Sequence, residues 1–135
     1  MSRQRGFSSL LMVLLLLALG SILLQGLNQQ QRSLLAQTAS ETQAIRLTAE
    51  VHSALQWGKE QEWPIHAEIA CRPAGTDGGR VCLRIFTDAS VLLIAGSGGL
   101  LLWQSGRVTE GVVRFSPHGW SDFCPLAEAR LCQMP

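Results

Sequence analysis

The stretch RQRGFSSLLMVLLLLALGSILL, residues 3–24, holds two arginines and a Gly-Phe junction ahead of an almost unbroken apolar run. The run covers 18 residues, from 7 to 24. In a helix it would rise about 27 Å, close to the roughly 30 Å hydrocarbon core of a bilayer. In a secretory signal peptide the cleavage site follows the apolar core. Here the recognisable junction, Gly6-Phe7, precedes that core, so cleavage there would leave the apolar segment in the mature protein.

Two interpretations of this segment begin with the same membrane-inserted precursor. In one, the segment is a plain single-pass anchor, and Arg3 and Arg5 hold its N-terminal end in the cytoplasm by the positive-inside rule. In the other, a peptidase cuts after Gly6 and the apolar helix is kept for assembly. The combination of a basic leader, Gly6-Phe7 and an apolar run that follows directly favours the second interpretation.

Length and charge indicate one small domain behind the apolar segment. A chain of 135 residues allows a single domain. The formal net charge is +1, and no Lys/Arg cluster occurs after the leader, where Lys59 is the only lysine. We therefore expect no nucleic-acid partner, because such proteins carry a basic patch or stripe.

The cysteines predict two disulfides. An even number in a small exported domain is typical of a disulfide framework. Three pairings are open, and we favour the local one, in which each bond closes a short loop that stabilises by about 2–3 kcal/mol. Ten residues separate the first two cysteines and seven the last two, whereas zinc ligands usually have the spacing Cys-x2-4-Cys, so no metal is expected. No cofactor is expected either. The four residues are Cys71, Cys82, Cys124 and Cys132.

A long helix is predicted from Phe7 to Gly58. Good helix formers continue beyond the apolar run, and nothing strongly breaks a helix before Pro64. In its second half one apolar stripe has helical spacing. The sequence leaves open whether the helix is continuous or has a joint near Gly26. The stripe consists of Ala44, Leu47, Val51, Ala54 and Leu55.

Short runs of β-type residues follow, separated by turn residues. Connections this short favour antiparallel neighbours. The third and fourth runs are apolar at successive positions, which predicts burial on both faces. We therefore expect an α+β fold, with one long helix on a small antiparallel sheet and a disulfide-tied C-terminal loop. The expected strands are residues 67–72, 81–86, 91–95, 100–104 and 112–116, and the expected connectors are residues 75–79, 88–90, 96–99 and 105–107.

The segment 115–125 is too rich in Gly, Pro and Asp to be expected as a strand. Its Trp120 and Phe123 would either contact a partner, as aromatic interface anchors do, or cap the small core. We favour the core role for both.

No catalytic residue is assigned. His118 shares its segment with Ser116, Ser121 and Asp122, but a triad needs a base within reach of its nucleophile, and no Gly-x-Ser-x-Gly elbow is present. Among the other histidines, His52 is expected beside the helical stripe or in solvent. The aspartates Asp77, Asp88 and Asp122 fall in three separate turns, which does not make a calcium loop. We expect a non-enzymatic protein.

The leader, the apolar segment and the long helix resemble those of type IV prepilins and type II secretion pseudopilins, the substrates of a membrane-embedded prepilin peptidase. The resemblance implies cleavage after Gly6 and N-methylation of Phe7. Most members carry glutamate at the fifth mature residue, where it pairs with the α-amine of a neighbouring subunit; here that position is Leu11. The tip pseudopilin of type II secretion systems also lacks this glutamate, so the resemblance implies a place at a filament end.

Two further stretches, residues 81–85 and 115–125, resemble a small enterobacterial family of prepilin-peptidase-dependent minor prepilins. The implied function is a minor pilin or pseudopilin that initiates or caps a type IV pilus-like or type II secretion filament. The implied partners are the prepilin peptidase, other minor subunits, the major subunit and the inner membrane. The alternatives are a single-pass inner-membrane protein with a periplasmic binding domain, or a tethered enzyme that uses the His118 region.

The resemblance to prepilins predicts four parts of the chain. Residues 1–6 are the leader, and residues 7–24 are the membrane or filament-core helix. Residues 25–58 continue as an amphipathic helix, and residues 59–135 form a periplasmic sheet domain. Whether the machine is a pilus or a secretion system stays open.

Overall fold

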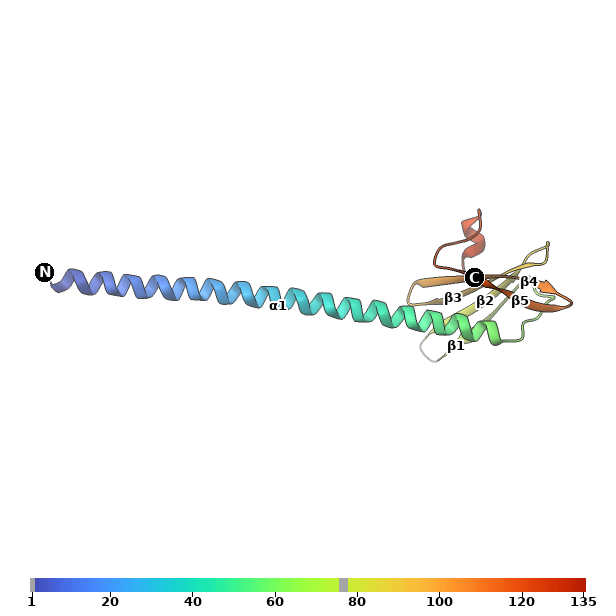
Figure 1. Cartoon of the computed structure of the whole chain (residues 1–135), viewed down its shortest axis with the longest axis horizontal. Helices are drawn as coiled ribbons and strands as arrows, with labels where there is room; N and C mark the ends of the chain where they lie inside the picture. Colours follow the sequence, from blue (N-terminus) through green and yellow to red (C-terminus); the bar gives the residue numbers. More distant parts are fainter. Residues whose placement is uncertain (1, 76–77) are drawn as a thin grey trace. The chain divides into compact units, whose positions relative to one another are not determined.

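The computed structural model describes residues 2–75 and 78–135, and for residues 2–5 it describes the backbone alone. One helix, α1 (Ser2–Glu60), is followed by the five strands of an antiparallel sheet and a short 3-10 helix, η1 (Ala129–Cys132) (Figure 1). The fold is therefore α+β, as expected. The chain divides into two compact units, Met1–Gln43 and Ala44–Pro135.

The first unit is helical throughout its described residues. Helix α1 continues through Gly20 and Gly26 without a break, so there is no joint near Gly26. Each glycine costs about 1 kcal/mol relative to alanine, which the helix formers on both sides outweigh. The large apolar side chains between residues 7 and 24 are all exposed.

The sheet of the second unit is a simple meander. Each strand pairs antiparallel with the next along the chain, in the order β1-β2-β3-β4-β5. The first three strands begin and end within two residues of the predicted runs, a difference typical of strand ends. The strands are β1 (Ile69–Ala74), β2 (Gly79–Ile85), β3 (Ser90–Ser97), β4 (Leu100–Thr109) and β5 (Val112–Ser121).

One face of the sheet packs against the last turns of α1. Val51, Ala54 and Leu55 of the predicted stripe are buried there, whereas Leu47 is half-buried and Ala44 is exposed. The stripe is therefore buried only from its middle onward. We call this side of the sheet the helix face; its core also contains Trp63, Val81, Leu83, Val91, Leu93, Ala95 and Leu102.

The other face is covered by the C-terminal segment 122–135, which we call the strap. Leu92, Ile94 and Trp103 form the second core with Cys132 of the strap, and Leu126 and Met134 pack against it. Strand β3 thus contributes alternate side chains to two cores, which confirms the prediction of burial on both faces. In β4 the same holds for Leu102 and Trp103.

The last hairpin differs from the prediction. Residues 105–107 lie inside β4, and the chain turns instead at Glu110 and Gly111, with φ of 53° and 77°. Two consecutive left-handed residues make the type I′ turn that suits a two-residue hairpin. Gly106 is not in a turn; glycine is needed there because β5 approaches closely, and a Cβ would lie 2.5 Å from the Arg114 carbonyl oxygen.

Strand β5 continues through Pro117 and Gly119 to Ser121, so the prediction that the segment 115–125 is not a strand is wrong for residues up to Ser121. The strand lies at the sheet edge, where proline is tolerated. Its register jumps at a bulge: Gly106 faces Phe115, but Gln104 faces Trp120. The buried Gln104 fills this irregularity by donating from Nε2 to the Ser116 carbonyl at 2.7 Å.

Candidate functional site

The predicted processing junction lies near the start of α1, within the first unit. Phe7 is 72% exposed, and a Cβ at Gly6 would meet nothing within 4 Å. The side chains of Arg3 and Arg5 lie outside the described residues. Leu11, one helical turn beyond Phe7, is also exposed. No described side chain therefore covers the peptide bond between Gly6 and Phe7, which lies within α1.

Helix α1 is a candidate membrane span. It contains an 18-residue window that is long and apolar enough to cross a bilayer, and none of that window is buried within the protein. A helix that is apolar on all sides belongs in a protein core or a membrane. No described part of the chain covers residues 7–24, which is consistent with single-pass anchoring.

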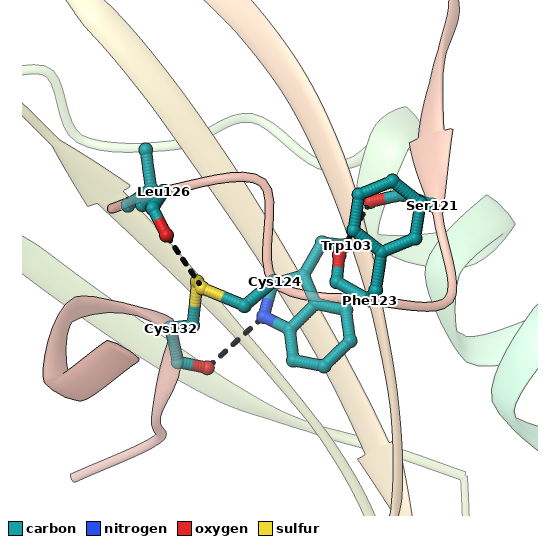
Figure 2. Close-up of a disulfide and its surroundings, with 6 residues drawn as sticks. All are labelled: Trp103, Ser121, Phe123, Cys124, Leu126 and Cys132. Atoms are coloured by element: carbon teal, nitrogen blue, oxygen red, sulfur yellow. Dashed lines mark hydrogen bonds between the residues drawn. A yellow bond between two sulfur atoms is a disulfide. The ribbon is translucent and has the colours of Figure 1, made fainter. Parts of the chain in front are cut away.

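The disulfides have the local pairing. Cys71 and Cys82 face each other directly across β1 and β2, with Cα atoms 4.0 Å apart. Cys124 and Cys132 close a loop within the strap, with Cα atoms 5.8 Å apart. Figure 2 shows the indole of Trp103 beneath this loop, where its Nε1 donates to the Cys132 carbonyl at 3.0 Å. The second disulfide thus shapes the segment that covers the sheet.

Trp120 and Phe123 do not cap the core. They are 53% and 68% exposed, so the core role that we expected for both is wrong. Trp120 instead contacts the exposed His52 of α1, with ring centroids 5.3 Å apart at an edge-on angle of 71°. Phe123 follows β5, where its carbonyl accepts a hydrogen bond from the Ser121 hydroxyl (Figure 2).

Trp63, which the sequence did not single out, occupies the core instead. It is buried, and its Nε1 donates to the Gly58 carbonyl at 2.8 Å, near the end of α1. The guanidinium of Arg72 lies 5.0 Å from the indole centroid on its outer side. A tryptophan directly before Pro64, three residues after the end of α1, was the available signal.

The His118 region shows no catalytic geometry. Among the described hydrogen bonds, none joins His118 to Ser116, Ser121 or Asp122. Ser121 donates to the Phe123 carbonyl, and Ser116 uses its carbonyl to accept from Gln104. Ser116, His118 and Ser121 are spread along the extended strand β5 and do not gather around one point.

Metal-binding groups are also not assembled among the described residues. In residues 2–75 and 78–135, no three His, Cys, Asp or Glu side chains come together as they would around an ion. Asp88 accepts hydrogen bonds from Ser90 in the β2–β3 turn, from the hydroxyl and from the backbone N–H. These bonds lower the pKa of Asp88. Asp77 lies outside the described residues.

A hollow of about 580 Å³ lies beside the last turns of α1 in the second unit. Its lining includes Trp57 and Ser53 of the helix and Ala74 at the end of β1. Glu50, the one carboxylate among the lining residues that the structure describes, is 3.9 Å from the guanidinium of Arg46. That described lining contains no histidine or cysteine, so we assign no chemistry to the hollow.

Comparison with known proteins extends over most of the chain. The model of a family described as protein of unknown function (DUF2509) matches residues 15–132. The match includes both disulfides and the greater part of the apolar segment, and it begins after the Gly6-Phe7 junction. No curated protein and no solved structure matches the chain significantly. The function must therefore be argued from the residues themselves.

Proposed function

We propose that the chain, which belongs to the DUF2509 family of proteins of unknown function, is a minor pilin or pseudopilin. In this role it is a non-enzymatic subunit that initiates or caps a type IV pilus-like or type II secretion filament. The observation that carries the proposal is the placement of Gly6-Phe7 at the start of the exposed apolar segment of α1, residues 7–24. The disulfide-closed sheet domain behind that helix supports it, because such bonds persist in the periplasm.

Cleavage after Gly6 would change the chemistry of the N-terminus. The leader with Arg3 and Arg5 would be removed, and Phe7 would carry a new α-amine, which is N-methylated in the proteins that the chain resembles. The apolar helix would hold the subunit in the inner membrane until assembly and would then pack in the filament. The sheet domain would face the periplasm and contact other minor subunits.

Leu11 supports a place at the filament end. An apolar residue at this position cannot accept the α-amine of a neighbouring subunit, whereas a buried carboxylate would need such a partner. The chain could still offer its own α-amine at Phe7 to a glutamate of the next subunit. It would then have one partner in the filament core instead of two.

Leu11 also favours the second candidate, a plain single-pass inner-membrane protein with a periplasmic binding domain. An anchor needs no carboxylate in its apolar segment, and Leu11 is what such a helix would have. The two candidates differ in whether the peptide bond after Gly6 is cut.

The intact mass and N-terminal sequence test the proposal directly. We would isolate the full-length protein from cells with and without prepilin peptidase. Minor-pilin function predicts a chain that begins at methylated Phe7 only when the peptidase is present. A chain that retains its leader in both strains would leave the plain anchor.

A pair of glycine variants separates recognition of the junction from any effect on the helix. At Gly6 and at Gly20 an added Cβ would meet nothing within 4 Å, so Gly6→Leu and Gly20→Leu are matched in the space that the described structure leaves for the first side-chain atom. We expect Gly6→Leu to accumulate as unprocessed precursor and Gly20→Leu to be processed normally. Equal processing of both variants would contradict cleavage at Gly6.

A further inference from the structure

The charged residues of the sheet have one sign. The five strands contain five arginines and no aspartate or glutamate. A sheet surface that mixed both signs would form cross-strand ion pairs, and these strands have none of the acidic partners. The residues are Arg72, Arg80, Arg84, Arg107 and Arg114.

Four of the five arginines lie on the strap side of the sheet. In β2, the residues Val81, Leu83 and Ile85 pack in the helix-face core, so Arg80 and Arg84 point to the other side. The same alternation applies in β4, where Val108 packs in the helix-face core and Arg107 precedes it. In β5 it applies to Arg114, which lies between Val113 and Phe115 of that core. Arg72 alone is on the helix face, over Trp63.

The strap uses only one of these four. Arg80 donates to the Pro135 carbonyl at 2.8 Å, at the end of the sheet that the strap covers. Arg107 and Arg114 are exposed and face each other directly across β4 and β5. Arg84 lies on the same face, because it pairs with Leu92 of β3, which in turn pairs with Ser105 of β4. Ser105 is two residues before Arg107, so its side chain is the next one along β4 on that face. We call Arg84, Arg107 and Arg114 the arginine patch.

No salt bridge among the described residues includes an arginine of the patch. The salt bridges among the described residues join Arg46 to Glu50 in α1 and Arg130 to Glu128 in the strap. The Asp88 carboxylate is near enough to Arg107 to feel its charge, but it accepts its hydrogen bonds from Ser90. The Nε of Arg84 is shielded from solvent and has no hydrogen-bond partner. Like charges directly opposite in a sheet are destabilising, so the patch weakens the isolated chain.

We infer that the arginine patch is a docking surface for an acidic segment of a partner protein. A guanidinium binds a carboxylate through two parallel hydrogen bonds, and two guanidiniums on neighbouring strands present adjacent sites for this. Attraction to anionic lipid typically needs clusters of about four to eight basic residues. Nucleic-acid binding needs a much more basic domain than a chain with a pI of about 7.7.

This inference does not depend on filament assembly. An acidic partner could dock on the patch whether the chain is a minor pilin or a plain anchored protein. Failure of cleavage after Gly6 would therefore leave the inference standing, and failure of docking would leave the proposed cleavage standing.

Fluorescence anisotropy of a labelled octaglutamate peptide tests the patch, with the full chain in non-ionic detergent micelles. The variant Arg107→Glu/Arg114→Glu leaves the half-buried Arg84 in place. The matched control Arg32→Glu/Arg46→Glu changes two exposed arginines elsewhere and has the same net charge. We expect saturable binding by the wild type and a loss on the order of tenfold or more in the patch variant. The control should change by no more than about twofold.

Thermal stability excludes unfolding as the cause of lost binding. Arg114→Glu alone replaces a like-charge pair by an opposite-charge pair, so its Tm should equal or exceed that of the wild type while its peptide affinity falls. No saturable peptide binding, or equal losses in patch and control variants, would overturn the inference. So would binding to phosphatidylglycerol vesicles that exceeds binding to neutral vesicles and is lost in the patch variant, if the wild type does not bind the peptide, because the patch would then serve a lipid surface.

Discussion

At the scale of single residues, the β2–β3 turn shows a polar side chain supporting a strained backbone. Ala89 has φ of 64°, a left-handed conformation that glycine adopts more readily. Its N–H donates to the Phe86 carbonyl at 3.1 Å, which gives a type I turn followed by a left-handed residue. The carboxylate of Asp88 accepts from the hydroxyl and the N–H of Ser90 on the far side of Ala89. Asp88 thus holds the turn closed.

The stability of this turn should depend on pH. The pKa of Asp88 is lowered, mainly by the Ser90 hydroxyl, then by the Ser90 N–H, with a smaller effect of Arg107. A carboxyl whose pKa is lower in the folded state stabilises the fold above its ordinary pKa of about 4, and this contribution is lost as the pH falls through the folded value. We expect Asp88→Asn to have a lower Tm than the wild type at neutral pH.

The measurement is a series of thermal melts from about pH 6 to about pH 2. The Tm values of wild type and Asp88→Asn should converge at the acid end, because the wild-type carboxyl is then protonated too. Ser90→Ala should reduce the difference, since it removes the first of the two bonds. Two curves that stay parallel over the whole range would show that Asp88 does not stabilise the folded state through its charge.

At the scale of elements, the β4–β5 hairpin uses glycine for two different reasons. Gly111 has φ of 77° in the turn, and a Cβ there would be 4.0 Å from Ile65, an ordinary contact. Gly106 lies in the strand, and a Cβ there would be 2.5 Å from the Arg114 carbonyl oxygen and 3.0 Å from the Phe115 Cα. One glycine is needed for its backbone angle and the other for the approach of two strands beside the bulge.

Substitution by asparagine separates these reasons. Gly111→Ala should cost about 1–2 kcal/mol of unfolding free energy from left-handed strain, and Gly111→Asn less, because asparagine adopts this region more easily. Gly106→Ala should cost about 1–3 kcal/mol from overpacking, and Gly106→Asn at least as much. Denaturant unfolding measures all four variants. If asparagine restored stability at Gly106, the close approach of β4 and β5 would not be the reason for that glycine.

The same hairpin shows what the sequence could predict. Five consecutive apolar residues in β3 predict burial on both faces from composition alone, and the two cores confirm it. Residues 105–107 were expected as a turn because glycine usually interrupts a strand. The reason for Gly106 is the backbone of β5, which the local sequence does not reveal. Trp120 is exposed although a core role was expected for it, and Trp63 is buried although nothing was expected of it, since only tertiary packing decides which indole is covered.

The candidate sites also differ in how far the sequence alone could predict them. The Gly6-Phe7 junction and the local disulfide loops are patterns of neighbouring residues, so the sequence alone could point to them. The arginine patch combines residues from β2, β4 and β5, and only the strand register brings them to one face. A list of scattered arginines in a chain of low net charge contains no such signal.

At the scale of the whole molecule, the second unit, Ala44–Pro135, contains all the residues of both described hydrophobic cores. Both hydrophobic cores consist of residues between Val51 and Met134, and both disulfides lie in the same part of the chain. The first buried residue, Val51, is about two helical turns beyond Ala44. Everything that the described structure uses to bury apolar surface is therefore present in residues 44–135.

We accordingly predict that a fragment of residues 44–135 folds alone in water with both disulfides, and that a fragment of residues 61–135 does not. The shorter fragment lacks Val51, Ala54 and Leu55, which cover the helix face of the sheet. Truncation of a single buried Leu or Ile side chain costs about 2–5 kcal/mol, and domains of this size have only about 5–15 kcal/mol in total. Circular dichroism should show a cooperative melt and a near-ultraviolet tryptophan signal for residues 44–135 only. If residues 44–135 stayed unfolded, the apolar helix before them would have to stabilise the domain itself, and membrane anchoring and folding could no longer be treated as separate tasks of the two units.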